Sequence, residues 1–390
     1  MLAKVEKQVK SHYNKANINL FRIMKYLFIL GNNPELSVAE IQAVLGKVKV
    51  ILQCRQYLLA DCSKFDCQKI MRQLGGTIKI GMVVGKRPSE GPVLDLAFSQ
   101  SGPGRFNFGL SFYGVKPNNL GMKIKRLLKE KGLPARLVVS REPALSSVIV
   151  TKEKCHDFLV GPDFFGLTCA VQDFEGYGQR DYGRPQSDEL SGMLPPKLAR
   201  MMVNLSELEP EQTLLDPFCG SGTILAEALD LGFKNLMASD ISAKAVSDTE
   251  KNSQWLVKKF KLSNFKFQIF NCDVKALSSK IKIGSVAGVV TEPYLGPALK
   301  GNEKKETILN IISEVEGLYQ AALAEFKKIL KPKGKVVMIW PQWHLGQQIF
   351  DLNLSDATAK IGFKRLDDNN LMYKREEQRV WRRVVILEKI

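Results

Sequence analysis

The sequence has few of the residues from which metal and redox sites are usually built. It contains only three histidines, and its seven cysteines include no CxxC pair. Structural zinc sites and redox dithiols take their ligands from closely spaced cysteines and histidines. The sequence therefore predicts no metal site, and the cysteines are expected to be buried, reduced thiols.

Long hydrophobic runs and low-complexity tracts are also missing. The apolar run at residues 26–30 is too short to span a bilayer or to form the core of an export signal. Because no tract has a disordered composition, both halves of the 390-residue chain are expected to fold, as two or three domains. We expect a cytoplasmic protein.

Positive charge is what the sequence has in excess. Its 57 lysines and arginines outnumber its 40 aspartates and glutamates, which gives a formal net charge of +17. A polyanionic partner accounts directly for this excess, whereas a small-molecule enzyme does not need it. General solubility is the alternative explanation. The charge favours a nucleic-acid partner.

Changes of pattern divide the chain into four segments. Residues 1–24 are basic with few apolar anchors, as in a flexible leader, and residues 25–172 alternate short strands and helices in an α+β manner. Residues 173–196 gather glycine, proline and arginine, which is typical of a linker. From residue 197 to 390 strands and helices alternate strictly, which predicts a parallel, doubly wound sheet with an antiparallel hairpin at its edge.

Three local patterns give more detailed predictions. Ser37 stands three residues before Glu40, as in a capping box that opens a helix. The run from Ser147 to Thr151 is expected to form a short strand. The basic C-terminal stretch that includes Arg382 and Arg383 is expected to be a solvated hairpin, with contact to phosphates as the alternative.

A glycine-rich turn joins a predicted strand to a predicted helix between Leu214 and Thr223. Gly220 and Gly222 would let a ligand approach the backbone closely, as in the first turn of nucleotide-binding sheets. Because no Lys-Ser/Thr pair follows the glycines, the turn is not a phosphate loop. Asp216 ends the strand and offers a carboxylate to a cationic or amine-bearing ligand. The other residues expected to line this turn are Pro217, Phe218, Cys219 and Thr223.

Two further aspartates end the next two predicted strands. Asp240 lies 24 residues after Asp216 (240 minus 216), where nucleoside-binding sheets carry the acid that accepts the ribose hydroxyls, and Ile241 stands beside it. Asp273 ends the third strand, where its carboxylate could accept from an adenine amine. Any one of these aspartates alone is more often a turn or cap residue. Together with the glycine turn, the set favours an adenosyl ligand.

These motifs resemble those of a known family. The sequence DPFCGSGT at 216–223 resembles the first motif of class I methyltransferases that modify exocyclic amines of bases. The segments RDYGRP at 180–185 and SGMLPPKLAR at 191–200 are similar to those before that motif in the THUMP-containing tRNA guanosine-10 N2-methyltransferases. The stretches YLFILGNNPELS at 26–37 and LSSVIV at 145–150 resemble the same family's N-terminal region.

The resemblance implies a fold and an activity. It implies a THUMP-like RNA-binding region within residues 25–172 and a Rossmann-like class I methyltransferase domain in residues 197–390. It implies S-adenosylmethionine as the methyl donor, which Asp216, the glycines, Asp240 and Asp273 would hold. The acceptor would be an exocyclic base amine in structured RNA, with N2 of a tRNA guanosine favoured.

The sequence departs from the family at the catalytic motif. The family's fourth strand ends in Asp-Pro-Pro-Tyr, whereas this chain reads TEPY at 291–294. Aligned on Pro293 and Tyr294, Thr291 takes the place of the catalytic aspartate and Glu292 that of the first proline. Glu292 would still supply an oxygen that accepts from the amine, with Thr291 assisting, while Pro293 fixes the turn and Tyr294 stacks on an extruded base. The alternative is a stiff turn without a catalytic role.

Two other functions are compatible with these residues. The Thr291–Glu292 departure allows a non-catalytic RNA-binding protein that retains the methyltransferase fold. A DNA adenine-N6 methyltransferase shares the cofactor motif, although the N-terminal resemblance argues against it. We therefore expect a tRNA-binding methyltransferase that acts in tRNA processing.

Overall fold

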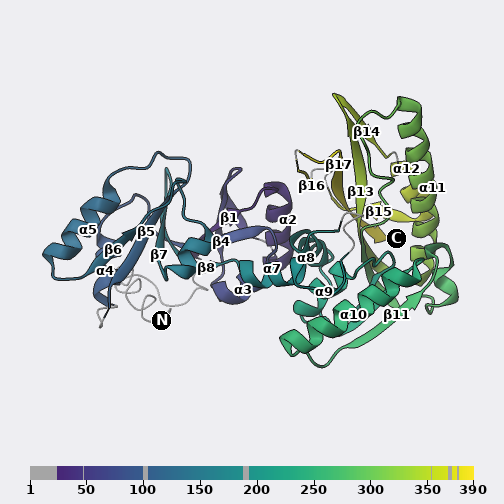
Figure 1. The fold of residues 1–390 in the computed structure, drawn as a ribbon, viewed down its shortest axis with the longest axis horizontal. Coiled ribbons are helices and arrows are strands. Elements are labelled where there is room, and N and C mark those ends of the chain that lie inside the picture. Colours follow the sequence, from purple (N-terminus) through teal and green to yellow (C-terminus); the bar gives the residue numbers. More distant parts are fainter. Residues whose placement is uncertain are drawn as a thin grey trace. The chain divides into compact units, whose positions relative to one another are not determined.

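The computed structural model describes residues 24–46, 48–99, 104–187, 193–352, 354–367, 371–375 and 377–390. Their contacts form two compact units (Figure 1). Unit 1 holds the described residues up to Pro34, those from 48 to Arg72, and those from Thr77 to Phe174. Unit 2 holds Glu35–Gly46, Gln73–Gly76 and the described residues from Glu175 to Ile390. The predicted leader lies outside the described residues except for Met24, which begins the first strand.

Unit 1 is built on an eight-stranded sheet with the order β2-β3-β1-β4-β8-β7-β5-β6. β5 pairs in parallel with β6 and β7, and the other neighbours pair antiparallel. This is the α+β arrangement that the sequence predicts. The strands are β1 (Met24–Leu30), β2 (Lys49–Gln53), β3 (Tyr57–Cys62), β4 (Thr77–Gly85), β5 (Phe106–Phe112), β6 (Ala135–Val138), β7 (His156–Val160) and β8 (Phe165–Val171).

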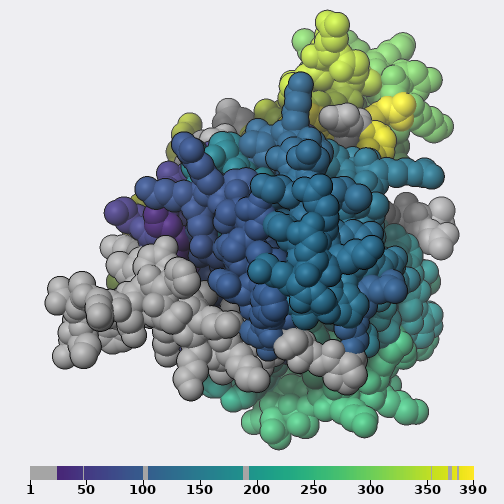
Figure 2. All heavy atoms as spheres, turned by 90° about the vertical axis from the view of Figure 1, so that its left-hand side faces the viewer, coloured from purple at the N-terminus to yellow at the C-terminus, as the bar shows by residue number. Residues whose placement is uncertain are grey.

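Helices pack against this sheet through buried apolar side chains. Val93 of α4, and Ile124 and Leu128 of α5, join Phe108 and Phe158 of the sheet in one core. The face that carries α4 and α5 is turned toward the viewer in Figure 2. The helices of unit 1 are α3 (Cys67–Gln73, shared at its end with unit 2), α4 (Gly91–Ser99), α5 (Leu120–Glu130) and α6 (Ser147–Lys152). The strand predicted at 147–151 is thus helix α6, in which the Ser146 hydroxyl accepts from the Ile149 N–H as an N-cap.

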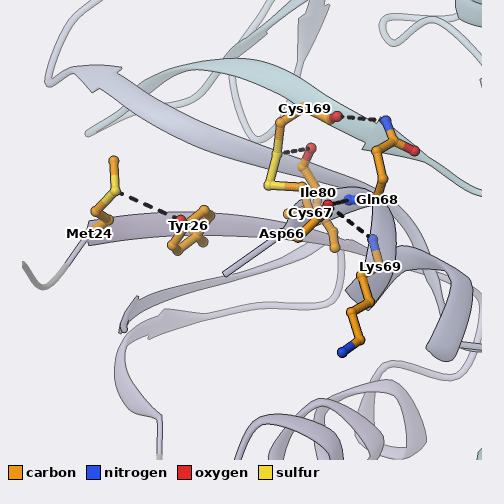
Figure 3. The surroundings of a disulfide bond; sticks show 8 residues. All are labelled: Met24, Tyr26, Asp66, Cys67, Gln68, Lys69, Ile80 and Cys169. Atoms are coloured by element: carbon orange, nitrogen blue, oxygen red, sulfur yellow. Dashed lines mark hydrogen bonds between the residues drawn. A yellow bond between two sulfur atoms is a disulfide. The ribbon is translucent and has the colours of Figure 1, made fainter. Parts of the chain in front are cut away.

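Two of the seven cysteines are joined. Cys67 at the start of α3 and Cys169 on β8 form a disulfide (Figure 3). The Gln68 side chain donates to the Cys169 carbonyl at 2.9 Å, which ties the same helix to the same strand. The expectation that all cysteines are reduced is therefore wrong for this pair. Their separation of 102 residues leaves no local pattern from which the pairing could be predicted.

Unit 2 contains the sheet that positions the candidate site. Its main strands run β11-β10-β9-β12-β13-β17-β15, and β17 runs in the direction opposite to the other six. In chain order this is 3-2-1-4-5-7-6, a Rossmann-like doubly wound sheet whose direction of winding switches between β9 and β12. The predicted antiparallel edge is confirmed. The strands are β9 (Thr213–Asp216), β10 (Asn235–Asp240), β11 (Lys266–Asn271), β12 (Val286–Thr291), β13 (Leu330–Leu345), β14 (Gln348–Asp351, paired with β13), β15 (Phe363–Arg365), β16 (Met372–Tyr373, paired with β17) and β17 (Val380–Lys389).

Helices cover both faces of this sheet because its strand side chains alternate between two cores. Leu215 and Val289 pack in a core with α11, whereas their neighbours Leu214 and Val290 pack in a core with α8 and α9. The near-continuous apolar strands are the pattern of a parallel sheet buried on both faces. The helices are α2 (Pro34–Leu45), α7 (Phe174–Tyr182), α8 (Pro196–Leu205), α9 (Thr223–Asp230), α10 (Ala243–Phe260), the 3₁₀ helix η1 (Val274–Ser279), α11 (Lys305–Ile329) and α12 (Ser355–Ile361).

A segment from the N-terminal part of the chain belongs to unit 2. The buried Glu40 carboxylate of α2 accepts from the backbone N–H groups of Gly75 and Gly76 at 2.7 and 2.8 Å, and from the Asn204 side chain at 2.7 Å. Ser37 donates to the Gly76 carbonyl at 2.9 Å. Both residues lie inside α2, which begins at Pro34, so the predicted capping box is wrong. Their polar atoms instead fasten the 73–76 segment to α2 and α8.

The predicted linker also contains ordered structure. Residues 174–182 form helix α7, in which Tyr177 and Arg180 are buried. Arg180 and Arg200 both bind the fully buried Glu227 carboxylate of α9, at 2.6 and 2.7 Å. Residues 188–192 of the predicted linker lie outside the described part of the chain.

Within the described residues, no helix combines the length and hydrophobicity that crossing a membrane requires.

Candidate active site

The glycine turn after β9 has an open backbone. Gly220 and Gly222 have φ of +51° and +85°, which side-chain-bearing residues rarely adopt. A Cβ on Gly220 would meet no atom within 4 Å, whereas one on Gly222 would meet the Thr249 side chain at 3.1 Å. The first glycine therefore leaves space over the turn, and the second allows α10 to pack closely beneath it.

Side chains from α10 fix the shape of this turn. The Thr249 hydroxyl donates to the Gly220 carbonyl at 2.8 Å, and the Asn252 amide donates to the Ser221 carbonyl at 2.8 Å. At the start of α9, Thr223 accepts from Nη1 of the buried Arg184 at 2.7 Å. The sequence singles out neither Thr249 nor Asn252, because a polar residue in a helix carries no sign of the loop it will hold.

Asp240 joins the end of β10 to the glycine turn. Its Oδ2 accepts from the Gly220 N–H at 3.0 Å and its Oδ1 from the Ser242 N–H at 2.9 Å. An ionised carboxylate can accept about four hydrogen bonds, so each oxygen retains capacity for a ligand hydroxyl. Ile241 follows with 72% of its surface exposed, as an apolar contact beside the carboxylate.

Asp273 has a local partner. Its carboxylate accepts from the Lys275 N–H at 2.9 Å and caps η1. The Asn271 side chain donates to the carbonyls of Asp240 and Ile241 at 2.8 and 2.9 Å, so the ends of β10 and β11 are held together. Contact between Asp273 and an adenine ring stays a prediction.

Asp216 is directed into the sheet. It is buried, and its Oδ1 accepts from the Thr291 hydroxyl at 2.7 Å and the Phe218 N–H at 3.2 Å. Burial raises the pKa of Asp216 from 3.8 to about 7, although these two hydrogen bonds oppose the rise. Pro217 and Cys219 are buried as well, whereas Phe218 is partly exposed. The turn thus presents its backbone more than its side chains.

The turn after β12 separates the residues of the TEPY motif. Thr291 is fully buried and its hydroxyl is committed to Asp216. Pro293 is also buried, while the Tyr294 ring is 45% exposed. The Tyr319 hydroxyl of α11 donates to the Tyr294 carbonyl at 3.2 Å, which holds the turn in place. Thr291 therefore lies beneath the site, and only Glu292 and Tyr294 of the motif have side chains that reach solvent.

Glu292 forms an ion pair that the sequence does not suggest. Its Oε1 accepts from Nε of Arg382 on β17 at 2.6 Å, and the two side chains are only 14% and 9% exposed. Burial raises the pKa of Glu292, and the charge and hydrogen bond of Arg382 oppose the rise. The sequence predicts Arg382 in a solvated hairpin, but the residue is buried on an inner strand of the sheet.

Comparisons with known proteins agree with this geometry. A family model described as RMKL-like, methyltransferase domain, matches residues 184–365. A protein of Methanothermococcus thermolithotrophicus named "Probable tRNA (guanine(10)-N2)-dimethyltransferase" is 35% identical over 122 residues, which are 30% of this chain and 72% of the relative. At this identity and coverage, the chain belongs to the same methyltransferase family as this relative. The resemblance seen in the sequence is thereby confirmed for residues 184–365, and the THUMP-like region stays a prediction.

Other relatives of the family match shorter shares of their length. The tRNA (guanine(10)-N2)-dimethyltransferase of Methanocaldococcus jannaschii is 34% identical over 127 residues, and the match covers 32% of this chain and 35% of that enzyme. The chain thus spans about a third of that relative. TrmN from Thermus thermophilus has a TM-score of 0.53 and 17% identity, covering 95% of this chain and 100% of TrmN, which shows a shared fold.

Proposed function

We propose that this chain is an S-adenosylmethionine-dependent RNA methyltransferase that methylates an exocyclic base amine, with N2 of a tRNA guanosine as the acceptor. The observation that carries the proposal is the position of two turns on neighbouring strands at the switch point of the sheet. The open glycine turn follows β9, and the turn with Glu292 and Tyr294 follows β12. Ligands of doubly wound sheets bind at such a point. The activity named for the relatives supports the acceptor.

The residues at the first turn fit an adenosyl group. The space over Gly220 admits a ligand against the backbone, Asp240 has oxygens that can accept from ribose hydroxyls, and Ile241 offers an exposed apolar side chain to a flat base. Asp273 would assist at the adenine edge. When bound, S-adenosylmethionine supplies an activated methyl group on a sulfonium, ready for direct transfer to a nucleophile.

Glu292 would act on the acceptor amine. An exocyclic amine is a weak nucleophile because its lone pair is delocalised into the ring. A carboxylate oxygen that accepts one N–H of the amine orients the lone pair and stabilises the positive charge that develops on nitrogen. Oε1 of Glu292 is held by Arg382, so Oε2 is the atom available for the amine. The ionised carboxylate is the stronger acceptor, and it supplies the negative charge that a protonated carboxyl group lacks.

Tyr294 would receive the base. A paired or stacked base cannot reach an enclosed site, so the nucleotide must swing out and be held by stacking. The exposed ring of Tyr294, whose backbone is fixed by Tyr319, is suited to that contact. Pro293 limits the movement of the turn between the acid and the ring.

Basic residues of unit 1 would hold the RNA. Helix α5 buries Ile124 and Leu128 and exposes Lys125 and Lys129 on its other side. Together with the net charge of +17, this basic helix supports binding to phosphates that weakens as salt increases. We also propose that unit 1 contains the THUMP-like region.

One experiment separates the candidate functions. The protein is incubated with S-adenosylmethionine carrying a labelled methyl group and with unmodified tRNA, and the nucleosides are analysed by mass spectrometry. The proposal expects label in N2-methylguanosine or its dimethyl form. Label in adenine of duplex DNA, with none in tRNA, would favour a DNA adenine-N6 methyltransferase.

A non-catalytic RNA-binding protein is the second candidate, and the burial of Thr291 is the observation that favours it. The residue aligned with the family's catalytic aspartate has no carboxylate and does not reach solvent. Binding of both S-adenosylmethionine and tRNA without any transfer of label would support this candidate and contradict the enzymatic one.

A further inference from the structure

The side chains of Thr291 and Glu292 are directed toward different strands of the sheet. Thr291 is directed toward Asp216 on β9, on one side of β12. Glu292 binds Arg382 on β17, and β13 lies between β12 and β17 in the sheet. The acid stands one residue later than in the family motif. In that position it pairs with an arginine on a strand that is distant in the sequence.

Arg382 is the cation that faces Glu292 in the described part of the chain. The other titratable groups around Glu292 are Asp216 of β9 and Tyr319 of α11. Asp216 is acidic, and Glu292 contributes to the rise in its pKa. Tyr319 is fully buried with a strongly raised pKa, so it stays neutral. Without Arg382, Glu292 would be a largely buried acid beside another acid.

The geometry of the ion pair leaves the acid usable. Contact runs from Nε of Arg382 to Oε1 of Glu292 alone, while Nη1 donates to the Gln378 side chain at 3.2 Å. The described residues make no further hydrogen bond to the Glu292 carboxylate. A two-pronged arginine contact would occupy both oxygens. The single contact orients the carboxylate and leaves Oε2 free to accept.

We propose that Arg382 is a positioning residue that keeps the displaced carboxylate of Glu292 ionised and correctly oriented for the acceptor amine. This inference rests on the proposed methyl transfer and adds to it a residue that the family motif does not contain. The guanidinium of Arg382 contacts the side chains of Glu292 and Gln378. It acts through Glu292, because a protonated carboxyl group accepts more weakly and brings no negative charge to the amine, and a rotated one is directed away from it.

The test compares Arg382→Gln and Arg382→Lys with the wild-type protein. Arg383→Gln is the matched control, because it removes a cation from the next position of β17, where Arg383 pairs with Asp351 at 2.9 Å. Two quantities are measured across pH. One is kcat for methyl transfer to tRNA. The other is the carbon-13 shift of the Glu292 carboxyl carbon in protein without cofactor, assigned by its loss in Glu292→Gln.

Removing the charge is expected to raise the pH at which Glu292 ionises. The midpoint of the carboxyl titration and of the acid limb of kcat should both rise by about 1 to 3 pH units in Arg382→Gln. Below the new midpoint kcat should fall about tenfold for each further decrease of one in pH, and it should recover at alkaline pH. KM for tRNA should change less than kcat. Arg382→Lys should titrate near the wild type, and Arg383→Gln should match it.

Two outcomes would overturn the inference. In one, the Glu292 titration in Arg382→Gln is unchanged from the wild type. In the other, Arg382→Lys moves the titration midpoint as far as Arg382→Gln does, which would mean that shape and not charge is required. Failure of the proposed function is a different result: the wild type transfers no methyl group at any pH, while the carboxyl titration still reports on the ion pair.

Discussion

Gly220 and Gly222 lie in the same turn but have different surroundings: Gly220 faces open space, whereas Gly222 is closely packed. The φ of +51° at Gly220 strains any other residue by about 1 kcal/mol. Unlike Gly222, it has no atom in the place of a missing side chain. The packing of the fold therefore does not fill the space over Gly220, and a ligand can occupy it.

Gly220→Ala should consequently affect binding more than stability. The added methyl group projects into the space over the turn, so we expect S-adenosylmethionine affinity measured by calorimetry to fall at least tenfold, while the free energy of unfolding decreases by about 1 kcal/mol. Gly284→Ala is the control, because Gly284 has a φ of +65° and equally open surroundings. Equal loss of affinity in both variants would contradict the assignment.

Asp216 gives a prediction about pH. Its pKa is about 7 in the folded chain, against an ordinary value of 3.8, so the folded state binds the extra proton between these values. A raised acid pKa means that stability decreases as pH rises from about 4 to 7. Asp216→Asn, which can still accept from Thr291, should remove that part of the decrease, on the order of a few kcal/mol.

Urea unfolding of wild type and Asp216→Asn between pH 4 and 8 measures this difference. Glu40 has a pKa of about 7 as well, and it contributes equally to both proteins. A difference in unfolding free energy between the two proteins that does not vary with pH would show that Asp216 has the same pKa in the folded and unfolded states, which would contradict the prediction.

At the scale of elements, the ends of β9, β10 and β11 are joined by side chains that follow them. Asp240 accepts from the backbone N–H of Gly220, which follows β9, and from that of Ser242, which follows β10. Asp273 only caps η1. The two acids look alike in the sequence, because both simply end a strand. Their different partners distinguish a residue that shapes the turn from one that stands beside it.

Asp240→Ala should therefore weaken S-adenosylmethionine binding more than Asp273→Ala does. Loss of Asp240 removes both the ribose acceptor and a support of the Gly220 N–H, and we expect a reduction of about a hundredfold in affinity, or about 2.7 kcal/mol. Calorimetric titration of the two variants under one condition measures the order. Unchanged affinity in Asp240→Ala would remove the residue from the site.

Local sequence predicted some elements better than others. Strand–turn–helix at 214–223 was predictable, since the apolar run, the glycines and the following helix are contiguous. Residues 147–152 form a helix because Ser146 caps them and tertiary packing outweighs strand preference. The sequence does not predict helix α7, because its segment is rich in glycine and arginine and its stabilising contact to Glu227 comes from another helix.

At the scale of the whole molecule, the fold class followed from the sequence and the long-range pairings did not. The strict alternation after residue 197 predicts a doubly wound sheet, because buried parallel strands must be linked by helices. No pattern indicates that α2 belongs to unit 2, that Cys67 meets Cys169, or that Arg382 meets Glu292. Each joins residues that only the complete fold brings together.

The charge of the molecule gives a prediction about its RNA partner. Reversing Lys125 and Lys129 of α5 to glutamate should lower tRNA affinity and make it less sensitive to salt, because fewer counterions are released on binding. S-adenosylmethionine affinity should stay the same. Reversing the exposed Lys251 and Lys258 of α10 to glutamate controls for net charge, because it also reverses two lysines, and filter binding at several salt concentrations measures the effect. Equal losses in both proteins would argue against a specific basic surface on α5.

Methyl transfer by this chain is expected to depend on Glu292, and not on residue 291, as the group that serves the acceptor amine. Single-turnover methyl transfer to tRNA by Glu292→Gln, with cofactor affinity measured alongside, tests it most directly. We expect the rate to fall by about a hundredfold or more while S-adenosylmethionine binds as in the wild type. A Glu292→Gln protein that transfers methyl groups at the wild-type rate would contradict the account.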